Sequence, residues 1–219
     1  MLNIIEGANF VGKTSTLIEL KKKKPSSIFV YHPRFNDAQF YDYSYNIKEV
    51  LVLPTPKVVK VPMMIPRDIV YQISHVVCLK YLESFKDKNI ILDRVFLSEM
   101  VYNDLYNMEL YGELVEILKK DFEYKIYFLT CDDEEQLKLR IKSRLEQDKT
   151  KKGFGVRVGN TVDPETVEEK FNVQKLLTQR YLNIMEFYKL NYYTIDTSYI
   201  PQKDVAKLIL DDIKEENNG

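Results

Sequence analysis

The segment GANFVGKT, residues 7–14, is a complete G-x-x-x-x-G-K-[ST] phosphate-binding loop. An apolar run, residues 2–6, stands directly before it, where this motif requires a strand. Loop glycines let backbone N–H groups turn inward around phosphates, Lys13 reaches the β and γ oxygens, and the Thr14 hydroxyl can bind Mg²⁺. A helix beginning near Lys13 would add its N-terminal dipole to the anion site. The segment therefore predicts binding of a nucleoside triphosphate, with a chance match at a strand-to-helix turn as the alternative.

Composition predicts one intracellular domain spanning residues 1–219. The chain has 32 basic and 33 acidic residues and a net charge of −1, so no overall field favours nucleic acid or an anionic membrane. No run approaches the ~18 apolar residues of a membrane span, and no signal segment precedes the first strand. Cys78 and Cys131 lie in apolar stretches and are expected to be buried thiols of a reducing compartment. We expect a soluble, cytoplasmic protein without nucleic-acid or membrane partners.

Alternation of apolar runs with helical patterns predicts a three-layer α/β/α fold with a parallel five-stranded sheet. The predicted strands are residues 2–6, 27–31, 89–93, 124–130 and 192–196. The predicted helices are residues 13–24, 67–86, 97–121, 133–147, 164–190 and 203–215. Their order makes a βα chain in which each helix returns the chain to the next parallel strand.

Two segments depart from the βα pattern. Residues 48–62 contain two Val- and Leu-rich runs around Pro54 and Pro56, which predict a hairpin-like excursion. Residues 148–163 are rich in Gly and Lys and lie between two predicted helices. A loop of this length is usually functional, so this one is predicted to be a mobile lid over the nucleotide, with a plain connector as the alternative.

The rest of the chain indicates which class of phosphate-loop protein this is. It has no N-K-x-D or D-x-x-G segment of a GTPase and no L-S-G-G-Q segment of a transporter ATPase. Asp93 and Arg94 follow the strand of residues 89–93, and parallel strands present their carboxyl ends to one crevice. The Asp93 carboxylate could hold Mg²⁺ or its waters, and the Arg94 guanidinium could grip a second phosphate. A simple ion pair at the end of the strand is the alternative.

Several motifs in order resemble the thymidylate kinase family of P-loop nucleoside monophosphate kinases. EGANFVGKTS is similar to that family's E-G-x-D-x-x-G-K-[ST]-[ST] loop, and DRVFLSEMVYN is similar to its D-R-x(3)-S-x(3)-Y-Q segment. The strand and helix before the family's lid resemble TCDDEEQLKLRIKSR, and the helix after the lid resembles FNVQKLLTQRYLNI. The last strand of the family resembles YTIDTS. The resemblance extends over most of the chain and implies a kinase fold with a lid.

The resemblance also implies roles on the acceptor side. Arg94 would bind the acceptor α-phosphate, and Asp93 would support Mg²⁺ and position that arginine. Tyr102 would pack beneath the sugar and disfavour a 2′-hydroxyl, Asn103 would contact the base, and Arg67 would be a second acceptor contact. The alternatives are a core aromatic at Tyr102 and a surface polar residue at Asn103.

Some positions depart from the family pattern. Asn9 stands where the family loop usually carries Asp, and the loop holds no arginine, so charge for the transferring phosphoryl group must come from elsewhere. Arg140, Arg144 and Arg157 are candidates, although Arg140 and Arg144 could be solvated helix charges. The predicted nucleotide-binding residues are Gly7, Asn9, Gly12, Lys13, Thr14 and Ser15. The predicted catalytic residues are Lys13, Asp93, Arg94, Arg144 and Arg157, with Thr14 and Asp93 as Mg²⁺ ligands.

The predicted reaction is transfer of the γ-phosphoryl group of ATP to a deoxynucleoside monophosphate, with dTMP favoured by the resemblance. One alternative is a deoxynucleoside kinase, which would need a general base for the 5′-hydroxyl. His32 stands where such kinases tend to carry Glu and could be that base, although a lone His at a strand end is more often structural. Another is a nucleotide-binding module without catalysis. The predicted partners are small-molecule nucleotides, and the resemblance suggests a homodimer.

Overall fold

The computed structural model describes most of the chain outside two long segments. The described residues are 1–24, 27–31, 75–76, 78–85, 88–102, 108–150 and 166–216. The predicted excursion at residues 48–62 lies outside them, as does the predicted lid apart from its first residues. In the described part of the chain no helix is long and apolar enough to cross a membrane, and both cysteines are buried and free.

Five parallel strands form one sheet in the order β2-β3-β1-β4-β5, which confirms the predicted sheet. The strands are β1 (Leu2–Glu6), β2 (Ile28–Tyr31), β3 (Ile90–Asp93), β4 (Tyr124–Thr130) and β5 (Tyr192–Asp196). The residues of β1 are all buried because helices cover both faces of a parallel sheet. The edge strand β5 differs, since most of its residues are partly or fully exposed.

The described helices follow the predicted pattern closely. They are α1 (Lys13–Lys23), α3 (Phe96–Tyr102), α4 (Met108–Asp121), α5 (Glu134–Thr150), α6 (Val167–Phe187) and α7 (Gln202–Glu216). Residues 75–76 and 78–82 are also helical and lead into the short 3-10 helix η1 (Glu83–Phe85). The single helix predicted over residues 97–121 corresponds to α3 and α4, and residues 103–107 lie outside the described part.

The ends of α5 and α6 define the chain on either side of the predicted lid. Helix α5 continues to Thr150, so the first residues of the predicted lid are helical. Helix α6 begins with a capping box, in which the Glu169 N–H donates to Thr166 Oγ1 (3.2 Å) and the Thr166 N–H donates to Glu169 Oε2 (3.0 Å). These contacts satisfy backbone N–H groups that a helix start otherwise leaves without partners.

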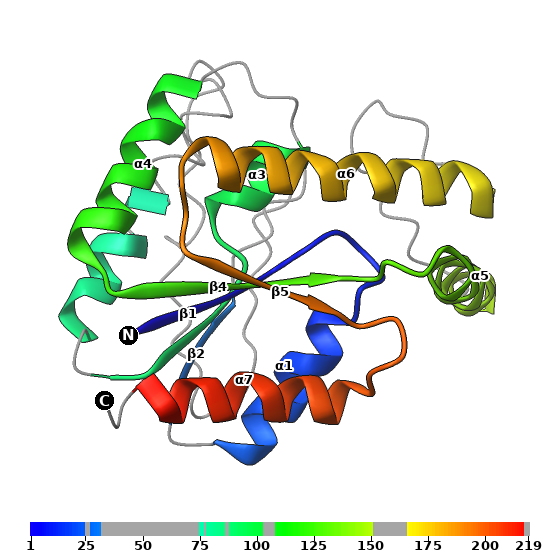
Figure 1. Cartoon of the computed structure of the whole chain (residues 1–219), viewed down its shortest axis with the longest axis horizontal. Helices are drawn as coiled ribbons and strands as arrows, with labels where there is room; N and C mark the ends of the chain where they lie inside the picture. Colours follow the sequence, from blue (N-terminus) through cyan, green and yellow to red (C-terminus); the bar gives the residue numbers. More distant parts are fainter. Residues whose placement is uncertain are drawn as a thin grey trace.

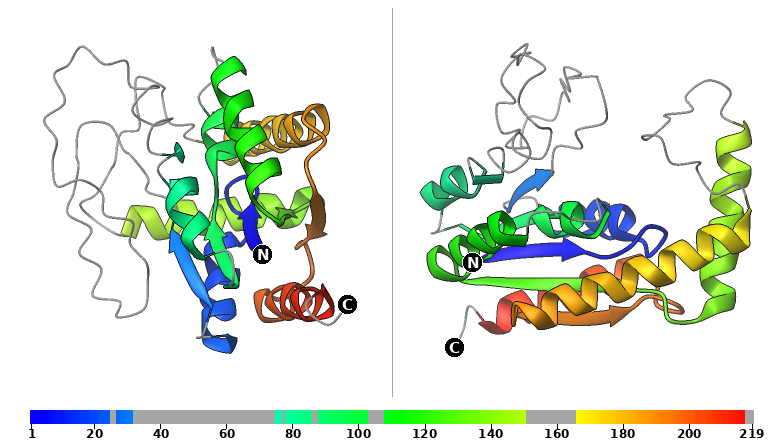
Figure 2. Two further views of the ribbon diagram at one scale, coloured as in Figure 1. Left: turned by 90° about the vertical axis from the view of Figure 1, so that its left-hand side faces the viewer. Right: turned by 90° about the horizontal axis from the view of Figure 1, so that it is seen from above.

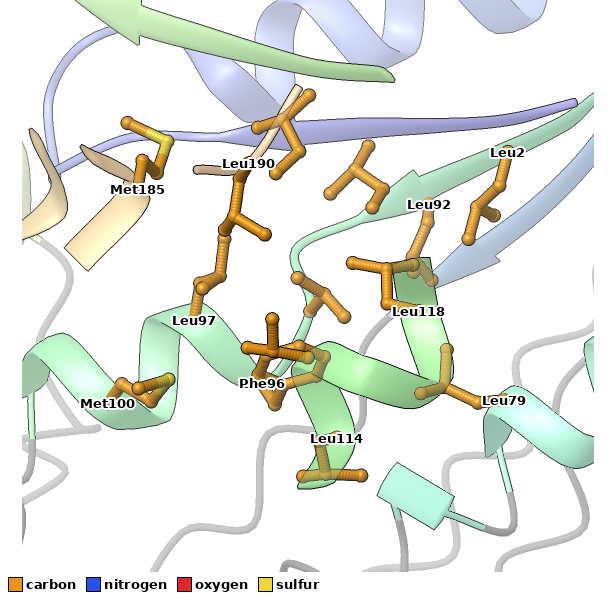
Figure 3. Close-up of a cluster of buried hydrophobic side chains, with 14 of the residues drawn as sticks. Leu2, Leu79, Leu92, Phe96, Leu97, Met100, Leu114, Leu118, Met185 and Leu190 are labelled. Atoms are coloured by element: carbon orange, nitrogen blue, oxygen red, sulfur yellow. The ribbon is translucent and has the colours of Figure 1, made fainter. Parts of the chain in front are cut away.

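Helices cover the two faces of the sheet as separate layers (Figure 1). Helices α1 and α7 pack together on one face, and α3, α4 and α6 cover the other. Figure 3 shows part of the second layer, where leucines from β1 and β3 meet side chains of the covering helices. Each fully buried Leu or Phe contributes about 1.5–3 kcal/mol relative to exposure, so this packing holds the layers in place.

The strand order brings two loops together at the carboxyl edge of the sheet. Strand β1 lies between β3 and β4, with Ile5 in register with Asp93 on one side and Tyr127 on the other. The loop after β1 therefore emerges beside the loop after β3. Helix α5 stands at this same edge and packs against α6 (Figure 2).

Candidate active site

Two glycines give the loop after β1 its shape. Gly7 has a φ of 142°, and a Cβ there would lie 2.3 Å from the carbonyl oxygen of Leu129 in β4. Gly12 has a φ of 90° in the left-handed region, directly before α1. Residues with a Cβ rarely adopt such angles, and at Gly7 the side chain would also collide with backbone. The motif glycines are therefore required by the close approach of the loop to β4 and by the turn into α1.

Lys13 lies inside the loop and not in solvent. Its side chain is buried, and Nζ donates to the carbonyl oxygens of Gly7 (2.6 Å) and Ala8. Thr14 and Ser15 are exposed in the first turn of α1, which carries no acidic residue. The positive end of the helix dipole and the ammonium group therefore act at the same place, which favours an anion.

Arg94 joins the loop after β3 to the loop after β1. Its N–H donates to the carbonyl oxygen of Ile5 (3.1 Å), and Nη2 donates to Asn9 Oδ1 (3.4 Å). The φ of Arg94 is 68°, a left-handed angle that strains a residue with a side chain. The structure thus places Arg94 beside the phosphate-binding loop, and the half-buried Asp93 precedes it at the end of β3.

Glu6, the last residue of β1, holds the turn that follows Arg94. Its carboxylate is fully buried, where Oε1 accepts from the Val95 N–H (2.7 Å) and Oε2 accepts from Ser98 Oγ (2.9 Å). Burial raises the pKa of Glu6, while Arg94, the two hydrogen bonds and Lys13 act in the opposite direction. Sequence reasoning missed this residue, although an acidic residue ending an apolar strand was a visible signal.

The Arg94 guanidinium is charged and incompletely hydrogen-bonded. It lies 5.7 Å from the centre of the Tyr102 ring, and Nη1 donates to Ser98 Oγ over 3.4 Å. In the described structure its buried Nε has no hydrogen-bond partner. Burial alone would lower the pKa of Arg94, but Tyr102, Tyr181 and the acidic groups nearby raise it, so the guanidinium stays protonated. The arrangement leaves this cation able to bind a further anion.

Tyr102 is not a residue of the core. Its side chain is 37% exposed at the end of α3, with one face toward Arg94. The alternative of a core aromatic is therefore wrong for Tyr102. Stacking of a guanidinium on a tyrosine is a weak attraction that helps to orient both groups.

Helix α6 supplies two polar side chains that sequence reasoning missed. Gln174 is buried, and its Oε1 accepts from the Asn9 N–H (2.8 Å). Tyr181 is fully buried, with its hydroxyl 2.8 Å from Ser98 Oγ. Burial raises the pKa of Tyr181 well above its ordinary value, so the hydroxyl keeps its proton. The helix after the predicted lid thus contacts both the phosphate-binding loop and α3.

Arg140, which was considered as a lid arginine, contacts the loop that follows β5. Nη1 donates to Thr197 Oγ1 (2.9 Å), and Nη2 donates to the carbonyl oxygens of Thr197 and of Ser198 (3.3 Å). Thr197 Oγ1 is in turn 3.0 Å from the carbonyl oxygen of Val11 in the phosphate-binding loop. Arg140 therefore supports the loop between β5 and α7, while Arg144 lies exposed one turn further along α5. Arg140 is therefore not a solvated helix charge, because its guanidinium is partly buried.

The chemistry of the described oxygens fits Mg²⁺ held with a nucleotide. Thr14 lies in the first turn of α1 and Asp93 is the last residue of β3, both at the carboxyl edge of the sheet. Within the described ranges no group of three His, Cys, Asp or Glu side chains could hold a metal by itself. Mg²⁺ usually binds one or two protein oxygens together with phosphates and waters, so these two residues would suffice.

Four residues predicted or considered for this site lie outside the described residues. They are His32, Arg67, Asn103 and Arg157. Of the others, the structure brings Asn9, Lys13 and Arg94 together at the carboxyl edge of the sheet. The roles assigned to all these residues remain predictions.

Comparisons with known proteins support the fold. No protein-family model matches the sequence, and a search of curated proteins finds no match. Among solved structures, YorR protein from Bacillus subtilis in complex with phosphorylated GDP matches with a TM-score of 0.54 and 13% identity, over 100% of this chain and 99% of that one.

A second similar structure is deoxyadenosine kinase from M. mycoides with dCMP and dCDP, which matches with a TM-score of 0.51 and 16% identity. The same kinase with bound dATP matches with a TM-score of 0.52 and 17% identity, and both matches cover 98% of this chain and 100% of theirs. At such identities the likeness shows the fold, which is the P-loop kinase fold over the whole chain.

Proposed function

We propose that this protein transfers the γ-phosphoryl group of ATP to a deoxynucleoside monophosphate, giving ADP and the deoxynucleoside diphosphate. The proposal names dTMP as the acceptor, following the resemblance to thymidylate kinases. The observation that carries it is the placement of two cations at one edge of the sheet. Lys13 lies in the phosphate-binding loop, and Arg94 reaches that loop through Asn9. Two phosphate-bearing groups could therefore be held side by side.

On the ATP side, the loop amides and Lys13 bind the β- and γ-phosphates. The Lys13 ammonium exchanges its contacts with the carbonyls of Gly7 and Ala8 for phosphate oxygens. Ser15 adds a hydroxyl in the first turn of α1. Mg²⁺, held by Thr14 and Asp93 together with the phosphates, would neutralise part of the triphosphate charge.

On the acceptor side, Arg94 orients the α-phosphate. Among the described residues its Nε has no partner and its Nη atoms make two long hydrogen bonds, which would leave capacity for a phosphate oxygen. A phosphate acceptor is already nucleophilic and needs no general base, which agrees with the absence of an acidic residue at position 32. Tyr102 would lie beneath the sugar, with Asn103 and Arg67 as further contacts.

Catalysis in this proposal is mainly electrostatic. The transition state of phosphoryl transfer spreads negative charge over the equatorial oxygens, and fixed cations stabilise it. Lys13 and Arg94 supply two of these charges, and Arg144 and Arg157 would supply others when the segment after α5 closes over the nucleotide. Closure would also exclude water, which otherwise accepts the phosphoryl group.

The experiment is ADP release from Mg-ATP, coupled to NADH oxidation, with a panel of acceptors. The panel holds dTMP, dUMP, dCMP, dAMP, dGMP, their ribose forms, thymidine and deoxycytidine. Turnover with a deoxynucleotide but not with its nucleoside is expected. No turnover with any acceptor would contradict the proposal and favour a binding module without catalysis.

A second candidate function is phosphorylation of a deoxynucleoside at its 5′-hydroxyl. It is favoured by the structural match with deoxyadenosine kinase from M. mycoides over the whole chain. Such a reaction needs a general base near the acceptor hydroxyl, and His32, which directly follows β2 in the sequence, is a candidate. The panel separates the two candidates if deoxyadenosine is added, since turnover with nucleosides alone would establish the second.

A further inference from the structure

Helix α6 contacts both halves of the candidate active site through one buried face. Gln174 and Tyr181 lie in positions i and i+7 of α6, which places them on the same side of the helix. Between them lies Leu177, which is also buried. Two polar residues on an otherwise apolar stripe need partners, because an unpaired buried polar group costs about 1–3 kcal/mol.

Those partners form a hydrogen-bonded series that leaves α6 and returns to it. The Asn9 N–H donates to Gln174 Oε1 (2.8 Å), and Asn9 Oδ1 accepts from Arg94 Nη2 (3.4 Å). Arg94 Nη1 donates to Ser98 Oγ (3.4 Å), which lies 2.8 Å from the Tyr181 hydroxyl. We name this series Gln174–Asn9–Arg94–Ser98–Tyr181 the α6 relay.

We propose that the α6 relay couples the ATP site to the acceptor site, so that each nucleotide strengthens binding of the other. Gln174 and Tyr181 are the positioning residues that act through Asn9 and Arg94. This inference rests on the proposed function, because it requires ATP at the loop and a phosphate at Arg94. It adds helix α6 as the element that connects the ATP site to the acceptor site.

The contacts of Lys13 give the physical reason for coupling. Its ammonium donates to the carbonyls of Gly7 and Ala8, directly before Asn9 in the chain. When the ammonium turns to a triphosphate, these carbonyls lose a partner and the peptide leading into Asn9 readjusts. Gln174 holds the Asn9 N–H from a packed helix, so the readjustment is passed to the Asn9 side chain and to Arg94.

Ser98 ties the other end of the relay to a rigid frame. With Glu6 ionised, Ser98 donates to Glu6 and accepts from Tyr181 and Arg94, which uses its whole hydrogen-bonding capacity. A buried hydroxyl whose donor and acceptor positions are all occupied has few alternative orientations. Because Ser98 contacts both Arg94 and Tyr181 of α6, a movement of Arg94 depends on the position of that helix.

The test is isothermal titration of dTMP into the protein with and without Mg-AMP-PNP; if another nucleotide of the panel is the substrate, it replaces dTMP. In the wild type, AMP-PNP is expected to tighten acceptor binding at least 5-fold, the lower end of typical coupling between sites. In Gln174→Met, which keeps the length but removes the acceptor atom, the factor should fall to below 2-fold. Gln174→Glu, which still accepts from Asn9, should keep most of it.

Gln179→Met is the matched control. This glutamine lies on the same helix but on its exposed side, where it donates to Asn183. It should leave the coupling factor unchanged. A loss of coupling in the control, or an equal factor in Gln174→Met and the wild type, would overturn the inference and leave Gln174 a structural residue.

Tyr181→Phe supplies an independent arm, because it removes only the hydroxyl. Combined with Gln174→Met it forms a double-mutant cycle, and the two losses of coupling should be far from additive if one relay carries both. An absence of coupling in the wild type would also overturn the inference. Failure of dTMP and every other acceptor to bind at all would contradict the proposed function instead.

Discussion

Two arginines at the carboxyl edge of the sheet are held in opposite ways. Arg140 donates to carbonyl and hydroxyl oxygens of Thr197 and Ser198, which give the guanidinium close partners from its own chain. Arg94 makes two hydrogen bonds of 3.4 Å and has a buried Nε without a partner in the described structure. A guanidinium has five N–H donors, so a well-matched arginine is structural and a poorly matched one is available to a ligand.

The largest expected effect is on catalysis at the poorly matched arginine. Arg94→Met should lower kcat/KM for the acceptor by about 1,000-fold, or about 4 kcal/mol, because a preorganised cation is lost from the transition state. Steady-state kinetics with the best acceptor of the panel measures this. Arg94→Lys is the matched variant, and it should recover only part of the loss because a point charge cannot replace the guanidinium fork. A loss below 10-fold in Arg94→Met would remove Arg94 from the acceptor site.

The well-matched arginine should show the opposite pattern. Arg140→Met should lower the free energy of unfolding by about 2 kcal/mol, since carbonyls that accept from a charged donor lose their partner. For a chain of this size that corresponds to a melting temperature lower by about 4–8 °C. Thermal unfolding followed by circular dichroism measures it, with kcat retained within about 10-fold. A large loss of kcat with unchanged stability would make Arg140 a catalytic residue after all.

Glu6 provides a test based on pH, because it places a buried carboxylate on the Arg94 side. Burial raises the pKa of Glu6 above its ordinary value of 4.5, so the folded state binds this proton more tightly than the unfolded chain. The contribution of Glu6 to stability is therefore complete below pH 4.5 and decreases as the pH rises through the raised value.

Urea unfolding of the wild type and Glu6→Gln at a series of pH values measures that contribution. The advantage of the wild type over the variant should shrink as the pH increases. Glu186→Gln, at an exposed position of α6, is the control and should show a constant difference. A difference for Glu6→Gln that grows with pH would contradict the direction of the shift.

The smallest expected effect concerns the ring beside Arg94. Tyr102→Leu should raise the acceptor KM by about 2- to 5-fold, because an exposed cation–π contact contributes about 0.5–1 kcal/mol. Melting temperature should change little, since the side chain is partly exposed and belongs to neither group of buried core residues. Parallel kinetics with deoxy- and ribonucleotides would show whether the ring also discriminates against the 2′-hydroxyl, and an unchanged ratio would place it away from the sugar.

The strands and the phosphate-binding loop were predictable because their signals are local. A continuous apolar run marks a buried parallel strand, and the loop motif needs only its own residues and the run before it. Strand boundaries at residues 124–130 and 192–196 agree with the structure. The sheet order was not predicted, since nothing in the local pattern specifies which strands become neighbours.

The supporting residues were not predictable from local patterns. Glu6 and Val95 are separated by 89 positions, and Asn9 and Gln174 by 165. In the sequence Gln174 is one polar residue in a helix and Tyr181 one aromatic on helical spacing. Arg140 was considered as a lid arginine because the phosphate-binding loop holds no arginine, and its contact with Thr197 could not be seen because that residue lies 57 positions away. Only the folded chain shows which polar residues meet.

The left-handed backbone of Arg94 sets stability against activity at one position. Its φ of 68° would suit glycine, and a left-handed residue with a side chain costs about 1–2 kcal/mol. Arg94→Gly should therefore unfold at a higher temperature than Arg94→Ala, while both lack the guanidinium. If the two variants melt together, the angle carries no strain. If the glycine variant is the more stable, a laboratory selection for thermostability alone would favour glycine at position 94 and discard the arginine proposed to bind the acceptor phosphate, so libraries built on this chain need position 94 held constant.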